Sequence, residues 1–178
     1  MNKLLNLYFL IAMVSINAQV TYIQGGGTLD DWAHLKKYEK DNMEIKGIDD
    51  PNRVVFIGNS ITEGWLYFNK SFFIENPFIN RGIGGQTTPQ MLIRFKPDVV
   101  NLNPKAVVIL AGINDIAGNT GPVTIENIAE NIFSMAEIAL ANNIEVLICS
   151  VLPAADFPWS PGKNPAEKVI KLNSLLKD

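Results

Sequence analysis

The chain has 178 residues, of which 47% are hydrophobic and 19% are charged, and its formal net charge is −3. This length suits one globular domain, and the hydrophobic content excludes intrinsic disorder. The charge balance excludes the basic surface that binding to nucleic acid needs. One cysteine and one histidine are too few for a metal site built from these residue types.

The first eighteen residues differ in character from the rest of the chain. Lys3 gives a positive start, an apolar run follows over residues 4–16, and Ala18 offers a small residue for cleavage. This three-part pattern predicts a secretory signal over residues 1–18, because the apolar run is too short to span a membrane. We therefore expect an exported protein, periplasmic or extracellular, with no integral membrane segment after cleavage. The alternative is a buried N-terminal helix or strand.

Residues 19–50 are expected to form an N-terminal extension to the main domain. Asp30 suits the N-cap of a helix, and Trp32, Leu35 and Tyr38 follow near helical spacing in a charged stretch. This pattern predicts a surface helix over residues 30–43.

Short apolar runs divide the rest of the chain, at residues 53–57, 77–80, 106–111 and 144–149. Such runs are typical of strands buried on both faces of a parallel sheet. Helical patterns lie between and after them, over residues 87–101, 124–142 and 164–177. The alternation predicts an α/β fold, with βαβ units around one parallel sheet, in a single domain over residues 51–178.

Glycines and small polar residues follow these runs. Ser60 comes after the first run on a tight turn into a helix, glycines 82, 84 and 85 come after the second, and Asn114 comes after the third. In an open parallel sheet, chemistry collects at the carboxyl ends of the strands. A serine at a helix N-terminus, glycine N–H groups and a neutral amide offer a nucleophile and donors for an oxyanion.

Three blocks resemble those of the SGNH (GDSL-type) hydrolase family: Gly-Asn-Ser-Ile-Thr at 58–62, Arg-Gly-Ile-Gly-Gly-Gln-Thr-Thr at 81–88, and Gly-Ile-Asn-Asp at 112–115. They are most similar to platelet-activating-factor acetylhydrolase-like and lysophospholipase-like bacterial esterases. The resemblance implies a three-layer α/β/α, flavodoxin-like fold that needs no cofactor. It also implies Ser60 as the nucleophile, with oxyanion donors from its own N–H, from the N–H of Gly85 (or Gly84) and from the Asn114 side chain.

Two departures from the family pattern matter. The family's Asp before the serine, which braces the turn, is Asn59 here. The family's last block, Asp-x-x-His, supplies the general base and the residue that orients it, and no such motif follows Ser60 in these 178 residues. The Asp-x-x-His at residues 31–34 lies before the serine, in the N-terminal extension. The one histidine, His34, is interpreted as a solvated surface residue. We therefore interpret the chain as ending before the last strand, the last helix and the catalytic His and Asp.

Structural interpretations stand beside the functional ones. The glycines can form an ordinary loop, and Asn114 and Asp115 can cap a helix, with a purely structural role for Asp115. Phe157 and Trp159 lie in a Pro-rich loop at a strand end, and we expect them to border the substrate pocket. Other aromatic residues suit packing, namely Trp65, Phe68, Phe72 and Phe73.

The expected function is that of an exported serine esterase for a small-molecule, carbohydrate or lipid ester, such as an acetyl ester of a carbohydrate or a lysophospholipid-type acyl ester. The alternative is a non-catalytic exported glycan-binding module that keeps the hydrolase shell without the base. A phosphate-binding α/β protein is disfavoured, because no glycine-rich phosphate-binding motif follows a strand. The run at 144–149, left as a sheet edge, predicts self-association, and the absent base predicts slow ester turnover.

Overall fold

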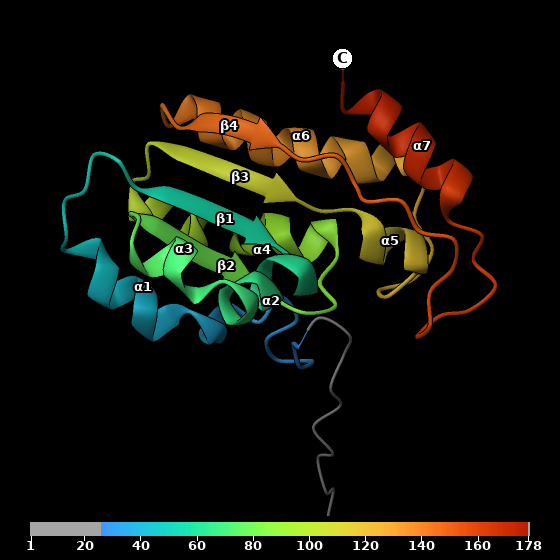
Figure 1. Cartoon of the computed structure of the whole chain (residues 1–178), viewed down its shortest axis with the longest axis horizontal. Coiled ribbons are helices and arrows are strands. Elements are labelled where there is room, and N and C mark those ends of the chain that lie inside the picture. Colours follow the sequence, from blue (N-terminus) through green and yellow to red (C-terminus); the bar gives the residue numbers. More distant parts are fainter. Residues whose placement is uncertain (1–25, 178) are drawn as a thin grey trace, which may run out of the picture.

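The structure is a computed structural model that describes residues 26–177, so the expected signal over residues 1–18 lies outside it. Its centre is a parallel sheet in the spatial order β2-β1-β3-β4 (Figure 1). The strands are β1 (Val54–Gly58), β2 (Phe78–Gly82), β3 (Ala106–Leu110) and β4 (Glu145–Ile148). The four expected strands and the parallel α/β arrangement are confirmed.

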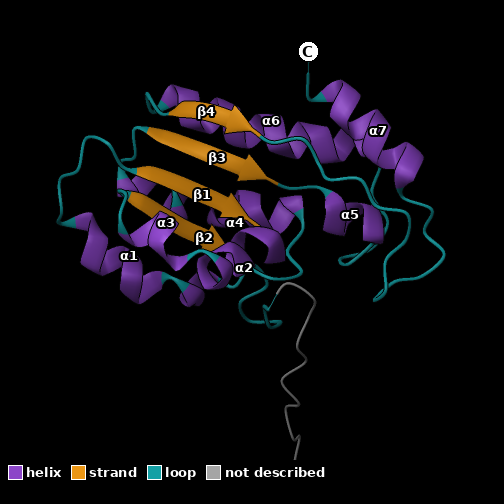
Figure 2. Cartoon of the chain, in the orientation of Figure 1, coloured by secondary structure: helices purple, strands orange, loops and turns teal. Residues whose placement is uncertain are grey.

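Helices connect the strands and follow the last one (Figure 2). They are α2 (Ser60–Phe68) and α3 (Lys70–Ile74), α4 (Thr88–Asp98) with the 3-10 turn η2 (Val100–Leu102), α5 (Ile113–Ala117) and α6 (Ile125–Ala141), and α7 (Ala166–Leu175). The helices expected over residues 87–101, 124–142 and 164–177 are confirmed, although the first divides into α4 and η2. Among residues 26–177, no helix is both long and apolar enough to cross a membrane.

The alternating side chains of the strands supply two packed layers. One face packs against α4 and α6 through fully buried residues, which include Val55, Ile57, Val107, Ile109, Phe95 and Ile132. The other face carries an aromatic cluster in which Phe56 contacts Trp65, Phe72, Phe73 and Phe78. The sheet therefore lies between two helical layers, as the three-layer fold class requires.

The strand β4 is less buried than its sequence suggests. Val146 and Ile148 pack towards the core, whereas Glu145 and Leu147 alternate to the opposite face and are exposed. Leu147 is 53% exposed. Burial on both faces, expected for the run at 144–149, is therefore wrong for β4, because its second face is open to solvent.

The N-terminal segment also differs from the helix expected over residues 30–43. It contains a single 3-10 turn, η1 (Leu35–Lys37), followed by the helix α1 (Glu39–Lys46). His34 has a left-handed backbone with φ of 56°, which no α-helix accepts. The Asp31 carboxylate, not Asp30, accepts the first N–H of the turn at 2.7 Å. The residues before η1 instead form contacts with the second block, described below.

Candidate active site

The strands β1, β2 and β3 end at one level of the sheet. Gly58, Gly82 and Leu110 are partners in the strand register, so the segments that follow them leave the sheet side by side. Because β2 and β3 lie on opposite sides of β1, the connections after β1 and β3 diverge there. Open α/β sheets bind ligands in the crevice at such a switch point.

Ser60 is the first residue of α2 and is exposed. The preceding Asn59 is the N-cap, and its Oδ1 accepts the N–H of Ile61 at 3.0 Å. The N–H of Ser60 lies at the open end of the helix, where the helix dipole favours negative charge. A pocket of about 180 Å³ brings the three predicted blocks together, because its lining consists of Ser60, Gly85, Asn114, Asn119 and Trp159.

The loop after β2 presents Gly85 to this pocket. Gly85 has φ of 77°, in the left-handed region that favours glycine. The N–H of Gly84 donates to Glu63 Oε2 at 2.7 Å, so the protein already uses that donor. Gly82 allows a close approach of the loop to α2, because a Cβ there would lie 2.1 Å from the backbone nitrogen of Glu63.

Asn114 lies in α5 and is 4% exposed. Its Nδ2 donates to the carbonyl of Gln86 at 2.9 Å, which fixes the amide against the loop after β2. A primary amide has two N–H groups, so the second remains for a ligand in the pocket. The neighbouring Asp115 accepts the N–H of Thr88 at 2.9 Å and its hydroxyl at 2.6 Å. These bonds join α5 to the first residue of α4, which is a structural role for Asp115. Burial raises the pKa of Asp115, and the Thr88 bonds oppose that shift.

The sequence model of the GDSL-like lipase/acylhydrolase family matches residues 56–178. The chain belongs to this family. A crystal structure of a GDSL-like lipase from Bacteroides thetaiotaomicron is 47% identical, with a TM-score of 0.77, over 82% of this chain and 72% of that one. A candidate acylhydrolase from Bacteroides fragilis is 49% identical, with a TM-score of 0.79, over 83% of this chain and 72% of that one.

A more distant relative is Platelet-activating factor acetylhydrolase IB subunit alpha2 of Rattus norvegicus. It is 28% identical over 130 residues, which are 70% of this chain and 52% of the relative. The chain thus spans about half the length of this curated relative. These similarities confirm the family that the three sequence blocks indicated.

In this GDSL-like protein the loop after β4 corrects one expectation. Trp159 lines the pocket and is 52% exposed, whereas Phe157 is 2% exposed and belongs to the hydrophobic core. The two rings contact each other, with centroids 5.1 Å apart. Phe157 therefore lies buried beneath Trp159 instead of bordering the pocket, because the irregular loop points only one of the pair to solvent.

Two polar residues near the pocket were not predicted from the sequence. Asn119 links both sides of the pocket: its Nδ2 donates to the carbonyl of Gly85 at 2.9 Å, and its Oδ1 accepts the indole N–H of Trp159 at 3.3 Å. Glu63 binds Gly84, as described above. Both lie in or after short helices, where sequence patterns do not distinguish them from solvated polar residues.

A buried arginine supports the site from below. Arg94 is fully buried, donates to Gln86 Oε1 at 2.5 Å and to the carbonyl of Gly58 at 3.1 Å, and pairs with Asp98 at 2.9 Å. Burial lowers the pKa of Arg94, and the Asp98 carboxylate opposes that shift. Arg94 thus joins the residue before Asn59 to the loop after β2. Only its spacing of four from Asp98 in a predicted helix could have signalled this pair.

None of the residues that line the pocket beside Ser60 can act as a general base near neutral pH. His34 is not among the residues that line this pocket. Its imidazole packs against Gly26, because a Cβ on Gly26 would lie 2.6 Å from His34 Nδ1. That nitrogen is buried and has no hydrogen-bond partner among residues 26–177. Burial and the charge of Lys37 lower the pKa of His34. His34 is half-buried and is not the solvated surface residue expected.

The substitution at Asn59 has a local cost. Its side chain is 1% exposed, and within the described residues its Nδ2 finds no acceptor. The Asp that is usual in the family would bring acceptors only. Asn59 keeps the cap through Oδ1 but buries an NH₂ group that has no partner within the described residues.

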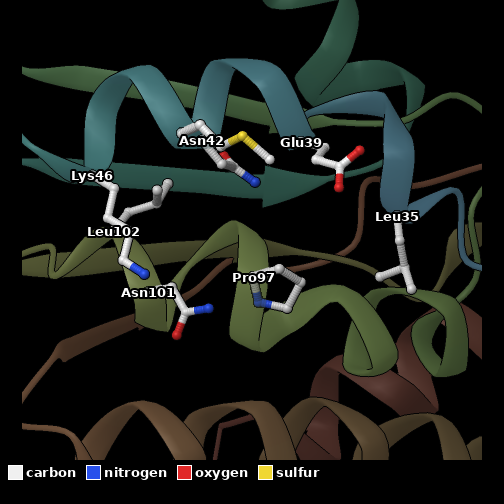
Figure 3. A pocket seen from close by; sticks show the side chains of 8 residues that line it. Leu35, Glu39, Asn42, Lys46, Pro97, Asn101 and Leu102 are labelled. Carbon is white, nitrogen blue, oxygen red and sulfur yellow. The ribbon is translucent and has the colours of Figure 1, made fainter.

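A second pocket, of about 300 Å³, lies between η1 and α1 on one side and α4 and η2 on the other (Figure 3). Leu35, Glu39 and Asn42 line it from above, and Pro97 and Asn101 from below. It contains none of the predicted site residues. Within residues 26–177, no cluster of three or more His, Cys, Asp or Glu side chains could hold a metal ion.

Proposed function

We propose that this protein is an exported serine esterase that cleaves carboxylic esters through a covalent acyl-Ser60 intermediate. The observation that carries the proposal is the meeting of Ser60, Gly85 and Asn114, from three different strand ends, in one pocket. The family supports it, since its members are described as lipases and acylhydrolases. The secretory pattern of residues 1–18 supports export.

In the proposed reaction the Ser60 hydroxyl attacks the ester carbonyl, whose oxygen becomes negatively charged. The N–H groups of Ser60 and Gly85 and the Asn114 amide donate to this oxygen. Collapse of the intermediate expels the alcohol, which takes up the proton from Ser60, and water then releases the acyl group as an acid. A histidine oriented by an aspartate, the pair that the family's last block implies and that does not follow Ser60 in these 178 residues, would move the proton in both steps.

The pocket favours an acetyl ester of a carbohydrate over a lysophospholipid-type acyl ester. Its volume of about 180 Å³ is small, and Trp159 is its one large apolar side chain. An exposed indole beside amide groups suits stacking on a sugar ring, whereas a fatty acyl chain needs a continuous apolar groove. Trp65 takes no part, because its ring stacks on Phe72 with centroids 4.7 Å apart.

A glycan-binding module is the second candidate. It is favoured by one observation, namely that no pocket-lining residue can take the Ser60 proton near neutral pH. Such a module would use Trp159 and the amides of Asn114 and Asn119 to hold a sugar without cleaving it.

Hydrolysis of p-nitrophenyl acetate and of a long-chain p-nitrophenyl ester by the wild type and by Ser60→Ala tests the proposal. Ser71→Ala is a matched control, since Ser71 is an exposed helical serine. We expect turnover of the acetate that is lost in Ser60→Ala and kept in the control. Equal turnover by the wild type and by folded Ser60→Ala would contradict the nucleophile. An inactive wild type that binds acetylated xylo-oligosaccharide in calorimetry would support the binding module.

A further inference from the structure

We infer that Glu63 is a positioning residue for the oxyanion site: its carboxylate holds the N–H of Gly84 and so leaves the N–H of Gly85 for the substrate. Lys37, in the N-terminal extension, holds Glu63 in place. This inference deepens the proposed function and depends on it.

Glu63 lies one helical turn after Ser60, in the first turn of α2. Its Oε2 accepts the N–H of Gly84 at 2.7 Å. A Cβ on Gly84 would lie 2.9 Å from that oxygen and 3.8 Å from the Ser60 Cβ, so Gly84 lies close to both the carboxylate and the serine. The same helix thus carries the proposed nucleophile and the group that fixes the loop opposite it.

A loop with two consecutive glycines has no side chain to decide which N–H faces the substrate. A hydrogen bond to a carboxylate is about twice as strong as one between neutral groups, so Glu63 competes well for one of the two donors. Gly85 is held from the other direction, because Asn119 donates to its carbonyl at 2.9 Å. With both restraints in place, Gly85 is the glycine that lines the pocket.

Lys37 pairs with the other oxygen of Glu63, and both side chains are about one-quarter exposed, at 26% and 27%. Lys37 lies outside the family match, which begins at residue 56. Neighbouring residues of the extension contact the same loop: Tyr38 donates its hydroxyl to the Gly82 carbonyl, and the Ala33 carbonyl accepts Gln86 Nε2 at 2.8 Å. The extension therefore supports the oxyanion site.

Amide exchange at glycine tests the geometry without any substrate. In protein labelled with ¹⁵N-glycine, the Gly84 amide should exchange at least about tenfold faster in Glu63→Ala than in the wild type. Glu63→Gln should retain most of the protection, since its amide oxygen can still accept. Glu44→Ala is the matched control, because it removes an exposed helical carboxylate that pairs with Lys40. It should leave the Gly84 amide unchanged.

Kinetics test the consequence. Misplacement of a catalytic group by about 1 Å can cost 10²-fold in rate, so we expect kcat for p-nitrophenyl acetate to fall about 10- to 100-fold in Glu63→Ala. KM should change less than about twofold, because the donor acts on charge that develops in the transition state. Glu63→Gln should recover most of kcat. Lys37→Met should lower kcat less than Glu63→Ala, since the Gly84 acceptor remains.

The two claims fail in different ways. A wild-type protein without esterase activity overturns the proposed function, whatever the exchange data show. Unchanged Gly84 exchange in folded Glu63→Ala, or a kcat no lower than that of Glu44→Ala, overturns the role of Glu63. If Glu63→Ala does not fold, the same measurements are made on Glu63→Gln and Lys37→Met. We expect Lys37→Met to lose Gly84 protection or to lower kcat. Wild-type values of both quantities in both variants would contradict the role of Glu63.

Discussion

The loops after β2 and β4 both border the Ser60 pocket, but they are held in different ways. Gly84, Gly85 and Gln86 of the loop after β2 bond to other elements through N–H or carbonyl groups, as do Gly82 and Thr88 at its two ends. The loop after β4 spans residues 149–165 and has fewer such bonds for its length. The N–H of Cys149 donates to the Ile109 carbonyl at 2.9 Å. Val151 bonds with Asn173, the Ser160 hydroxyl donates to the Ala117 carbonyl at 3.1 Å, and Trp159 donates to Asn119.

This difference corresponds to two functions of the pocket, namely stabilisation of the oxyanion and selection of the substrate. Donors for an oxyanion act best when they are fixed before the substrate arrives, because reorganisation during the reaction then costs nothing. A surface that selects among substrates tolerates more variation, and such surfaces are commonly placed on exposed loops. We therefore expect changes around the loop after β2 to affect stability and turnover, and changes in the exposed part of the loop after β4 to affect substrate affinity.

The largest effect on stability is expected for Arg94→Met. This change removes the cation that pairs with the buried Asp98 carboxylate, to which the neutral Asn42 amide still donates, and loss of one partner of a buried pair costs about 3–5 kcal/mol. Urea denaturation measures it. Lys171→Met, which removes an exposed pair with Glu126, should cost less than about 1 kcal/mol. Equal losses in the two variants would show that the loop after β2 does not depend on its buried support.

A change of similar size in the reaction barrier is expected for Asn114→Ala. Loss of one oxyanion donor lowers kcat about 10²–10³-fold, and KM should change little because the donor serves charge that develops late. Steady-state kinetics on p-nitrophenyl acetate separate the two constants. An effect confined to KM would show that Asn114 binds the substrate and does not stabilise the transition state.

A smaller effect is expected for Trp159→Ala, in the loop after β4. The indole is half exposed, so the free energy of unfolding should change little. Loss of about 1 kcal/mol of aromatic contact would raise KM for an acetylated sugar roughly fivefold at nearly constant kcat. Calorimetry with the deacetylated sugar compares the affinities of the wild type and Trp159→Ala without turnover. A large fall in kcat with unchanged KM would contradict a substrate-selecting role.

The smallest effect concerns His34, beneath the loop after β2. Burial and Lys37 lower its pKa, so protonation favours the unfolded chain. The stability that the neutral imidazole contributes is present above the unfolded pKa of about 6.5 and is lost as the pH falls through the folded pKa. His34→Asn, which tolerates the left-handed backbone, should therefore lose less stability than the wild type between pH 7.5 and about 5. Parallel thermal melts of the two proteins measure this, and identical pH dependence would contradict it.

The sequence predicted the parts of the fold that depend on local patterns. The strands were predictable because a buried parallel strand needs an uninterrupted apolar run, and Ser60 and Asn114 because small polar residues directly follow such runs. The exposed face of β4 could not be predicted, because an apolar run does not indicate which elements cover each face of the strand.

Other features depend on contacts between distant segments. Arg94 looks like a solvated helical charge until three partners from separate parts of the chain surround it. Gly84 and Gly85 are alike in sequence, and their contacts with Glu63 and Asn119 distinguish them. Phe157 and Trp159 lie two apart in an irregular loop that has no periodicity to predict which one is buried.

The most direct test of Ser60 as the nucleophile is mass spectrometry of the protein after brief exposure to p-nitrophenyl acetate. The proposed reaction passes through an acetyl group on Ser60, and rapid quenching with acid should trap that adduct. We expect one acetyl group, mapped to the peptide that contains Ser60, and none at that peptide in Ser60→Ala. An adduct of equal yield on another residue, with the Ser60 peptide unmodified, would contradict the assignment.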